Sequence, residues 1–342
     1  MLSAQKVLWF CVVLTIVYGV VLLFTNLKFI RDSTSVLTSV YTRQLGCVCP
    51  NTSTRSTRHE KGLHTELSVG WQGNDVLFHQ DDDDTVAQGL EQIVRVLCYV
   101  MTDQANLDTK TIHVKNTWTK RCNKILFISS VANKTFPTVG VNVSEGRGHL
   151  TEKAMKALQY IHKYHLDDSD WFLKTDDDTY VIMENLRHLL EPYSPNEPVY
   201  FGQHFKSHVK QGYHSGGAGY VMSKEALRRL VVKGIPSGKC WITGYDEDVH
   251  VGRCLEYVGV RIENSTDSLG RSRFHCFEPW VHLLGNYPEW YRKYDANGAK
   301  HGGDSVSDYA ISFHYVPSWL MYGLEYLVYH LRPYGVKMAD NE

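Results

Sequence analysis

The sequence predicts an α/β fold built on a mixed, mostly parallel sheet flanked by helices. Two short apolar runs, 124–131 (KILFISSV) and 171–175 (WFLKT), have the continuous hydrophobicity of buried parallel strands. Between them, residues 151–164 carry apolar side chains at helical spacing. A strand, a helix and a second strand in this order predict a right-handed crossover between strands of one sheet.

The size of the chain allows a substantial core. It has 342 residues, of which 43% are hydrophobic and 12% aromatic, and the globular pattern begins at Leu90 with the apolar segment 91–101. We expect one domain over residues 81–342. The 36 Lys and Arg nearly balance the 37 Asp and Glu, so no global field attracts the chain to nucleic acid or anionic membrane.

An apolar segment near the N-terminus indicates the compartment. Residues 7–24 contain no charge and lie between Lys6 and the pair Lys28 and Arg31, and 18 residues is about the minimum for a membrane-spanning helix. A cleaved signal peptide is the alternative, but no small-x-small cleavage site follows the run. We predict a cytoplasmic tail at 1–6, a transmembrane signal anchor at 7–24 and a luminal stem at 25–80, which is rich in Ser, Thr, Gly and Arg.

Sequons and cysteines agree with a luminal location. Four Asn-x-Ser/Thr sequons, at Asn51, Asn133, Asn142 and Asn264, are usable as glycosylation sites only if the C-terminal bulk is luminal. Seven cysteines follow the anchor, more than a cytosolic enzyme usually keeps: Cys47, Cys49, Cys98, Cys122, Cys240, Cys254 and Cys276. A zinc ribbon is disfavoured because Cys47-x-Cys49 has no second pair at ligand spacing. The odd number leaves one thiol free or bonded to another chain, and a homodimer linked through the stem is one possibility.

The sharpest motif is the acidic triplet Asp176-Asp177-Asp178, which directly follows the apolar run 171–175. Ligands of open α/β sheets bind beyond the carboxyl ends of the strands. Adjacent carboxylates at such a place favour a hard divalent ion, Mn²⁺ or Mg²⁺, which would bridge diphosphate oxygens. The alternative is a surface turn whose Asp caps a helix within 179–190. The earlier run Asp81–Asp84 is interpreted as a solvated turn or helix N-terminus.

Three further clusters have both a functional and a structural interpretation. The glycine-rich run 211–220 allows close backbone approach to a ligand, or is a turn before a helix at 223–232. One carboxylate of Asp246-Glu247-Asp248 would serve as a general base, or the three decorate a helix N-terminus. His314, between aromatic residues, is a ligand or a hydrogen-bonded core residue. Together with the acidic triplet, these are the parts that a metal-dependent sugar transferase requires.

Long strings in the chain resemble the core 1 β1,3-galactosyltransferase family, part of an inverting clan that includes Fringe-type enzymes. The matching strings run in order from about residue 90 to residue 336: KRCNKILFISS, EGRGHL, WFLKTDDDTYVIMENLR, FGQHFK, KQGYHSGGAGYVMSKEAL, DEDVHVGRC, SFHYV and YGLEYLVYHLRPYG. The resemblance implies a GT-A catalytic domain in a single-pass type II Golgi membrane protein. The implied reaction transfers galactose, with inversion, from UDP-galactose to the 3-hydroxyl of Ser/Thr-linked GalNAc on glycoproteins.

The same resemblance assigns roles to individual residues. Asp178 and His314 are implied as direct Mn²⁺ ligands, Asp176 as the other carboxylate of the metal motif, which holds the nucleotide or its ribose, and Asp248 as the general base. The implied nucleotide-sugar positions are Met101, Glu145, Gly146, Arg147, Lys153, Asp176, Asp177 and Tyr315. The implied acceptor positions are Tyr213, Gly216, Gly217 and Trp290. The implied disulfides are Cys98–Cys122 and Cys240–Cys254.

The chain also departs from the family pattern. The adjacent Cys-Cys near the family's C-terminus is replaced by KHGGDSVSDYA, Cys276 is additional, and 290–294 replaces a segment richer in Trp and Tyr. These changes concern the acceptor side. The alternatives are therefore a transferase of the same clan with another donor or acceptor, a catalytically weak paralogue, and a carbohydrate-binding module. A chaperone-like relative is disfavoured because it lacks the acidic motif that this chain retains.

Overall fold

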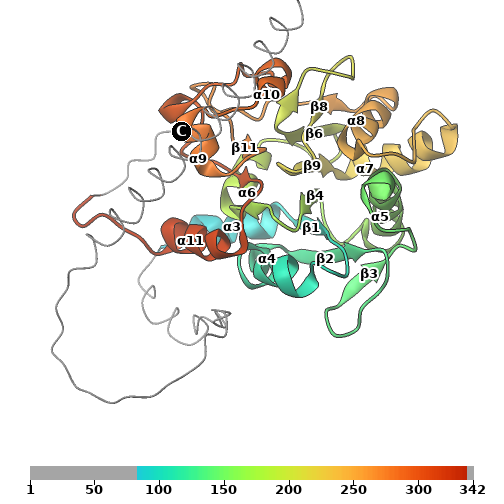
Figure 1. Ribbon diagram of the computed structural model, residues 1–342, viewed down its shortest axis with the longest axis horizontal. Helices are drawn as coiled ribbons and strands as arrows, with labels where there is room; N and C mark the ends of the chain where they lie inside the picture. The colour runs from blue at the N-terminus through green and yellow to red at the C-terminus, as the bar shows by residue number, and fades with distance from the viewer. Residues whose placement is uncertain (1–82, 337–342) are drawn as a thin grey trace, which may run out of the picture. The chain divides into compact units, whose positions relative to one another are not determined.

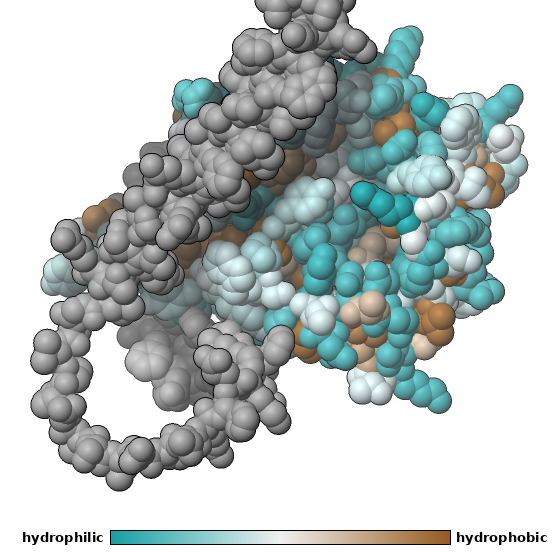
Figure 2. Space-filling view, in the orientation of Figure 1, coloured by the Kyte–Doolittle hydropathy of each residue, from teal (hydrophilic) through white to brown (hydrophobic). Residues whose placement is uncertain are grey.

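The structure is a computed structural model that describes residues 83–336. The predicted tail, anchor and stem, with Asn51, Cys47 and Cys49, lie outside the described residues. Within 83–336, no helix is both long and apolar enough to cross a membrane. The face drawn in Figure 2 is mainly hydrophilic, with apolar residues scattered among the polar ones, as is typical of a surface in contact with water.

A seven-stranded sheet forms the centre of the fold, in the order β10-β6-β9-β4-β1-β2-β3 (Figure 1). β1 pairs in parallel with both β2 and β4, and only β9 runs antiparallel to its two neighbours. The predicted mixed, mostly parallel sheet is therefore confirmed, as are both predicted strands. The bounds are β1 Val96–Met101, β2 Lys124–Ser129, β3 Thr138–Gly140, β4 Trp171–Asp176, β6 Val199–Gly202, β9 Tyr220–Ser223 and β10 Arg261–Ile262.

Two hydrophobic cores cover the two faces of this sheet, because alternate residues of a strand point to opposite sides. Leu97 and Tyr99 of β1 pack into the core formed with α5 (Leu150–His165), α7 (Lys224–Arg229) and α8 (Glu247–Tyr257). Cys98 and Val100 pack into the core that includes α3 (Thr85–Ile93) and α6 (Met183–Leu190). The helix predicted at 151–164 is thus confirmed as α5, on the α7–α8 side of the sheet (Figure 1).

Several predicted boundaries are wrong in detail. The apolar segment 91–101 is divided, since α3 ends at Ile93 and β1 begins at Val96. The helix expected at 223–232 is α7 followed by a π-turn, and the helix considered at 179–190 begins only at Met183. Asp84 occupies the N-cap position of α3, which supports the structural interpretation of the described part of the 81–84 run.

Two small sheets extend the fold beyond the carboxyl ends of the central strands. In the first, β12 (Ser312–Phe313) lies between β11 (Phe274–His275) and β5 (Tyr180–Val181). Its antiparallel pairing with β5 continues into a hydrogen bond of 2.9 Å from Val316 N to Asp178 O. The late segment around His314 is thereby held beside the acidic triplet. The second sheet pairs β7 (His204–Phe205) with β8 (Tyr213–His214).

The remaining described elements are helices and single turns. They are the helices α4 Ile112–Asn116, α9 Pro279–Leu284, α10 Glu289–Tyr294 and α11 Ser318–Tyr329, the π-turns Leu107–Thr111 and Leu230–Gly234, and the 3₁₀ turns Trp118–Arg121, Arg147–His149, Ile235–Ser237 and Gly302–Asp304. α11 packs against α4.

Both implied disulfides are present. Cys98–Cys122 ties the middle of β1 to the segment just before β2, and Cys240–Cys254 ties the loop before α8 to the helix itself. The second bond therefore anchors the segment that carries Asp246, Glu247 and Asp248. Among the described residues, Cys276 remains a free and buried thiol.

Candidate active site

The acidic triplet does not cap a helix. α6 begins at Met183, after β5, and its N-cap residue Ile182 makes no side-chain cap. Instead, oxygen atoms of Asp176 and Asp178 lie with a nitrogen of His314 in one group whose ligand atoms are all within 4.8 Å of one another. His314 Nε2 is 3.1 Å from Asp178 Oδ1 and 3.7 Å from Asp176 Oδ2. Two carboxylates and an imidazole form a donor set that could hold a metal ion.

His314 is both a hydrogen-bonded residue and a member of this group. Its Nδ1 lies 3.3 Å from the carbonyl oxygen of Cys276. When a metal ion is bound, a proton held on Nδ1 by that carbonyl would leave the lone pair of Nε2 for the ion, which is the usual arrangement of a metal-binding histidine. The two interpretations of His314 that the sequence left open are therefore compatible.

Asp178 is strongly biased to the ionised form. Burial raises the pKa of Asp178, but hydrogen bonding and charge from His314, with Lys110, outweigh that effect and lower the pKa to about 2. Lys110 Nζ is 3.1 Å from Asp178 Oδ2. The carboxylate is thus charged at any physiological pH, as a ligand for a divalent cation must be.

The middle carboxylate, Asp177, belongs to a different environment. It is buried, and its Oδ2 accepts hydrogen bonds from Thr102 Oγ1 at 2.8 Å and Asn106 Nδ2 at 3.0 Å. Burial raises the pKa of Asp177 to about 6. Asp177 therefore fixes the loop that follows β1.

The glycine-rich run is needed for close approach within the site. A Cβ at Gly217 would collide with the imidazole of His314, and one at Gly216 would lie 2.8 Å from Glu247 Oε2. Gly219 has φ +82°, a conformation that favours glycine. The run passes through β8 and a turn into β9 before α7 begins, so it is a turn ahead of a helix and also a wall of the site.

Asp248, the predicted base, lies in the first turn of α8. Its Oδ2 accepts a 2.9 Å hydrogen bond from Gly216 N, and its Oδ1 accepts one of 2.9 Å from Val249 N. Burial raises the pKa of Asp248, while these two N–H donors and Lys174 oppose the rise. Its neighbour Glu247 turns away and accepts a 2.6 Å bond from Tyr220 OH.

One open cavity of about 960 Å³ is lined by every residue predicted to bind the nucleotide-sugar, the metal or the acceptor, and by the predicted base. These lining residues are Met101, Glu145, Gly146, Arg147, Lys153, Asp176, Asp177, Asp178, Tyr213, Gly216, Gly217, Asp248, Trp290, His314 and Tyr315. We call this cavity the cleft. It lies at the carboxyl ends of β1 and β4, the edge of the sheet at which ligands of α/β proteins bind.

Glu145 and Lys153, which form one wall of the cleft, are joined by a hydrogen bond. Lys153 Nζ donates to Glu145 Oε2 and to the carbonyl oxygen of Thr102, each at 2.7 Å. Burial tends to raise the pKa of Glu145, but hydrogen bonds from Lys153 and Ser130 lower it on balance. Arg147 is exposed at the same mouth, so two basic side chains face this part of the cleft.

Aromatic rings form another part of the cleft wall. Trp290 of α10 is 43% exposed, and its ring centroid lies 5.9 Å from Phe205 and 5.8 Å from Phe277. Phe277 in turn stacks with Tyr315 at 6.1 Å, and Tyr315 has φ 56°. An exposed, braced indole is a common platform for the apolar face of a ligand.

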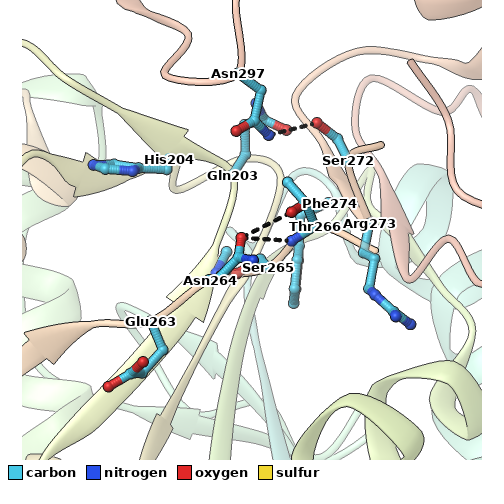
Figure 3. Close-up of a pocket in the computed structure, with 11 residues that line it drawn as sticks. Gln203, His204, Glu263, Asn264, Ser265, Thr266, Ser272, Arg273, Phe274 and Asn297 are labelled. Atoms are coloured by element: carbon cyan, nitrogen blue, oxygen red, sulfur yellow. Dashed lines mark hydrogen bonds between the residues drawn. The ribbon is translucent and has the colours of Figure 1, made fainter. Parts of the chain in front are cut away.

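A second pocket, of about 30 Å³, lies apart from the cleft and shares no lining residue with it (Figure 3). It holds room for about one water molecule, so it is no substrate site. Asn264, the acceptor residue of a predicted sequon, lines it and receives hydrogen bonds from Thr266 N at 3.1 Å and Thr266 Oγ1 at 2.9 Å (Figure 3). Asn264 and Asn142 are exposed, and Asn133 is half-buried.

Sequence reasoning missed several residues of the cleft. No sequence pattern pointed to Lys110, because it lies on a π-turn far from the acidic triplet in sequence. Thr102 and Asn106 were also missed, and only the fold places them beneath Asp177. Lys174 did have a signal: it precedes Asp176 by two positions on a strand, the spacing that puts side chains on one face.

The cleft and the sheet define a glycosyltransferase, and comparisons with known proteins agree. The Fringe-like family model matches residues 77–275, and the chain belongs to this family. It is 48% identical, over 262 residues that make up 75% of this chain and 72% of the relative, to glycoprotein-N-acetylgalactosamine 3-beta-galactosyltransferase 1 of Xenopus laevis.

More distant relatives share only part of their length with the chain. It is 31% identical to the mouse beta-1,3-glucosyltransferase over 44% of this chain and 31% of the relative. It is 27% identical to human chondroitin sulfate synthase 3 over 47% of this chain and 20% of the relative. The resemblance inferred from the quoted strings is confirmed.

Proposed function

We propose that this glycosyltransferase transfers galactose from UDP-galactose to the 3-hydroxyl of Ser/Thr-linked GalNAc on glycoproteins, with inversion, and so forms the core 1 O-glycan. The observation that carries the proposal is the meeting, in one cleft, of the Asp176–Asp178–His314 group with Asp248 across the Gly216–Gly217 turn. The similarity to the Xenopus laevis galactosyltransferase supports both substrates.

Asp176, Asp178 and His314 would hold a Mn²⁺ ion. Their two carboxylates and the Nε2 atom fit the coordination chemistry of this ion, and the Nδ1 contact to Cys276 O fixes the imidazole for that role. When bound, the ion supplies positive charge that neutralises the diphosphate leaving group. A lysine engages one oxygen of each carboxylate, Lys174 that of Asp176 and Lys110 that of Asp178, and the other oxygen of each faces His314. The choice of Asp178 and His314 as principal ligands in this proposal therefore rests on the family resemblance.

The donor nucleotide would lie between the β1 loop and the Glu145–Lys153 wall. Met101, Gly146, Arg147 and Tyr315 line this part of the cleft. Arg147 suits a diphosphate by charge, and the Glu145–Lys153 pair suits a role in shaping the wall. Asp177 would act on the nucleotide indirectly, through the loop of Thr102 and Asn106 that it fixes.

The acceptor would lie between Asp248 and the aromatic wall. Tyr213, Gly216, Gly217 and Trp290 line that side, and the exposed indole offers a stacking surface for a sugar ring. Asp248 then removes the proton from the 3-hydroxyl of GalNAc. The freed oxygen attacks the anomeric carbon of galactose from the face opposite UDP, the bond from that carbon to the diphosphate breaks, and the configuration inverts.

The same proposal extends to location. We infer a single-pass type II Golgi membrane protein with its catalytic domain, residues 81–342, in the lumen. Two disulfides and exposed sequon residues at Asn142 and Asn264 fit an oxidising, glycosylating compartment.

A transfer assay with the purified luminal domain tests the function. UDP-galactose, a GalNAc-peptide and Mn²⁺ should give a β1,3-linked disaccharide, identified by NMR of the product. UDP-glucose, UDP-GlcNAc and peptides bearing other sugars serve as controls, because the mouse relative is named a glucosyltransferase. A preference for another donor or acceptor, or glycan binding without UDP release, would contradict the proposal.

A further inference from the structure

Lys174 is a buried lysine at the point where three functional segments meet. Its side chain is 4% exposed, and its ammonium group contacts Asp176 Oδ1 at 2.8 Å, Gly216 O at 3.0 Å and Glu247 Oε2 at 3.4 Å. Two of the three donors of the ammonium group make hydrogen bonds, to Asp176 and Gly216, and the contact to Glu247 is an ion pair. The contacted groups come from β4, from the glycine-rich turn and from the first turn of α8.

The backbone beneath Lys174 holds the ammonium in one place. Lys174 lies on β4 between β1 and β9, where it pairs with Tyr99 and Tyr220. The hydroxyl of Tyr220 donates a 2.6 Å bond to Glu247 Oε1, so Glu247 is held by Tyr220 on one oxygen and by Lys174 on the other. A central strand of a sheet is a more rigid support for such a group than a loop.

Two of the three contacts lead to Asp248. Gly216 accepts from Lys174 through its carbonyl oxygen and donates to Asp248 Oδ2 through its N–H. Glu247 is the neighbour of Asp248 in α8, so fixing the Glu247 carboxylate fixes the first turn of that helix. The third contact fixes Asp176, which faces His314 with its other oxygen. Lys174 thus contacts Asp176 of the metal group directly and reaches the base Asp248 through Gly216 and Glu247.

We propose that Lys174 is a positioning residue for the transfer reaction, which holds Asp176 and Asp248 in one fixed relation through direct bonding to Asp176, Gly216 and Glu247. The proposal rests on the proposed function for its readout of turnover. The competing role is simple charge compensation, in which one buried cation offsets the negative charge around it without setting any geometry.

The variant Lys174→Met removes the ammonium group and keeps a side chain of similar length. We expect kcat for transfer to fall at least about tenfold, since misplacement of reacting groups by less than an ångström costs rate of this order. KM for the GalNAc-peptide should change less than kcat, because Lys174 reaches the acceptor side only through the carbonyl oxygen of Gly216. Lys224→Met, which breaks a peripheral ion pair with Asp167 at 2.7 Å, is the matched control and should leave kcat unchanged.

A double-mutant cycle separates positioning from charge compensation. At saturating UDP-galactose and Mn²⁺, adding Lys174→Met to Asp248→Asn should lower the residual rate by clearly less than Lys174→Met alone lowers kcat, because the part of the effect that acts through Asp248 is already lost. Full multiplication of the two single effects would overturn the proposal. So would recovery of turnover in Lys174→Met/Glu247→Gln, which restores charge balance without the ammonium group. If Lys174→Met does not fold, this charge-balanced variant, checked by thermal unfolding, replaces it: a tenfold loss supports the proposal and wild-type turnover overturns it.

Binding of UDP provides a readout that does not depend on the acceptor. In calorimetry with Mn²⁺, Lys174→Met should bind UDP at least about fivefold more weakly, since Asp176 loses the group that orients it. If the wild-type protein binds UDP but transfers no galactose to GalNAc, the proposed function fails and the UDP affinity alone decides the role of Lys174. Unchanged affinity in the folded variant would overturn that role.

Discussion

The imidazole of His314 lies 3.1 Å from the carboxylate of Asp178, although the two residues are far apart in the sequence. Pairing of β12 with β5 in the small sheet brings the two residues together, and the backbone hydrogen bond from Val316 N to Asp178 O continues this pairing. The predictions that follow concern this group and the groups that surround it.

Removal of the metal should abolish transfer. We expect EDTA to stop turnover and excess Mn²⁺ to restore it. His314→Ala should raise the Mn²⁺ concentration for half-maximal activity at least about tenfold, the usual scale for a changed metal environment. Titration of initial rate against Mn²⁺ measures this. Full activity of Asp178→Ala would indicate that the group does not hold the ion used in catalysis.

Loss of the base should separate binding from turnover. Asp248→Asn should bind UDP as the wild type does and lower kcat at least about a hundredfold. Calorimetry and initial rates measure the two effects on one protein sample. Retained turnover would move the base to Asp246 or Glu247, although Glu247 already accepts a bond from Tyr220 and faces Lys174.

The pH dependence of kcat should report the environment of Asp248. Burial raises the pKa of Asp248, against opposing effects of Gly216 N–H and Lys174, and the base works only when ionised. Activity should therefore fall, as pH is lowered, at a pH above the usual range of aspartate. The sign for stability is opposite: a raised carboxyl pKa stabilises the fold below the unfolded pKa, and this contribution is lost as pH rises through the folded pKa.

A measurement of kcat from pH 4 to pH 8 checks this prediction. The acid limb should be absent in the residual activity of Asp248→Asn. An acid limb at the ordinary aspartate pKa, or one that persists in the variant, would contradict the assignment.

The lack of a side chain at Gly217 should be essential. A Cβ there would overlap the ring of His314, so Gly217→Ala must displace the imidazole, and we expect at least a tenfold loss of kcat, about 1.4 kcal/mol. Gly303→Ala is the control, since a Cβ at Gly303 meets nothing within 4 Å. Equal activity of the two variants would show that the turn can shift to accommodate the added methyl group without loss of turnover.

The Cys240–Cys254 bond should support both stability and turnover. It closes a loop of 14 residues immediately before and within α8. Replacing both cysteines with Ala should lower the free energy of unfolding by roughly 2 to 4 kcal/mol and reduce kcat. Thermal unfolding and initial rates measure this, with Cys276→Ala as a variant that breaks no disulfide. An unchanged melting temperature in the double variant would contradict the prediction.

Much of the fold could be predicted because the spacing of apolar residues along the chain indicates its main strands and helices. The runs 124–131 and 171–175 and the helix 151–164 follow directly from apolar spacing, and β2, β4 and α5 confirm them. The boundary inside 91–101 was not predicted, because periodicity alone does not separate the end of a helix from a short buried strand.

The site could be predicted only in part. Asp176 and Asp178 were found because a carboxylate directly after a buried strand has few structural explanations. That His314 would meet them was implied by the family resemblance alone, because the meeting depends on pairing of β12 with β5, a contact between distant segments that no local pattern encodes. The separate role of Asp177 depends likewise on Thr102 and Asn106 at the end of β1.

The three-stranded sheet constrains how relatives of this protein can diverge. Because β12 delivers His314 to the carboxylates, the final segment of the chain cannot be exchanged or shortened as a unit without removing a donor-side group. Between β11 and β12, Cys276 still has to hold His314, but the part of this insert that contains α9 and α10 supplies no residue of the metal group. New acceptor preferences in this lineage should therefore arise by change within that insert, while the strands on either side of it stay fixed.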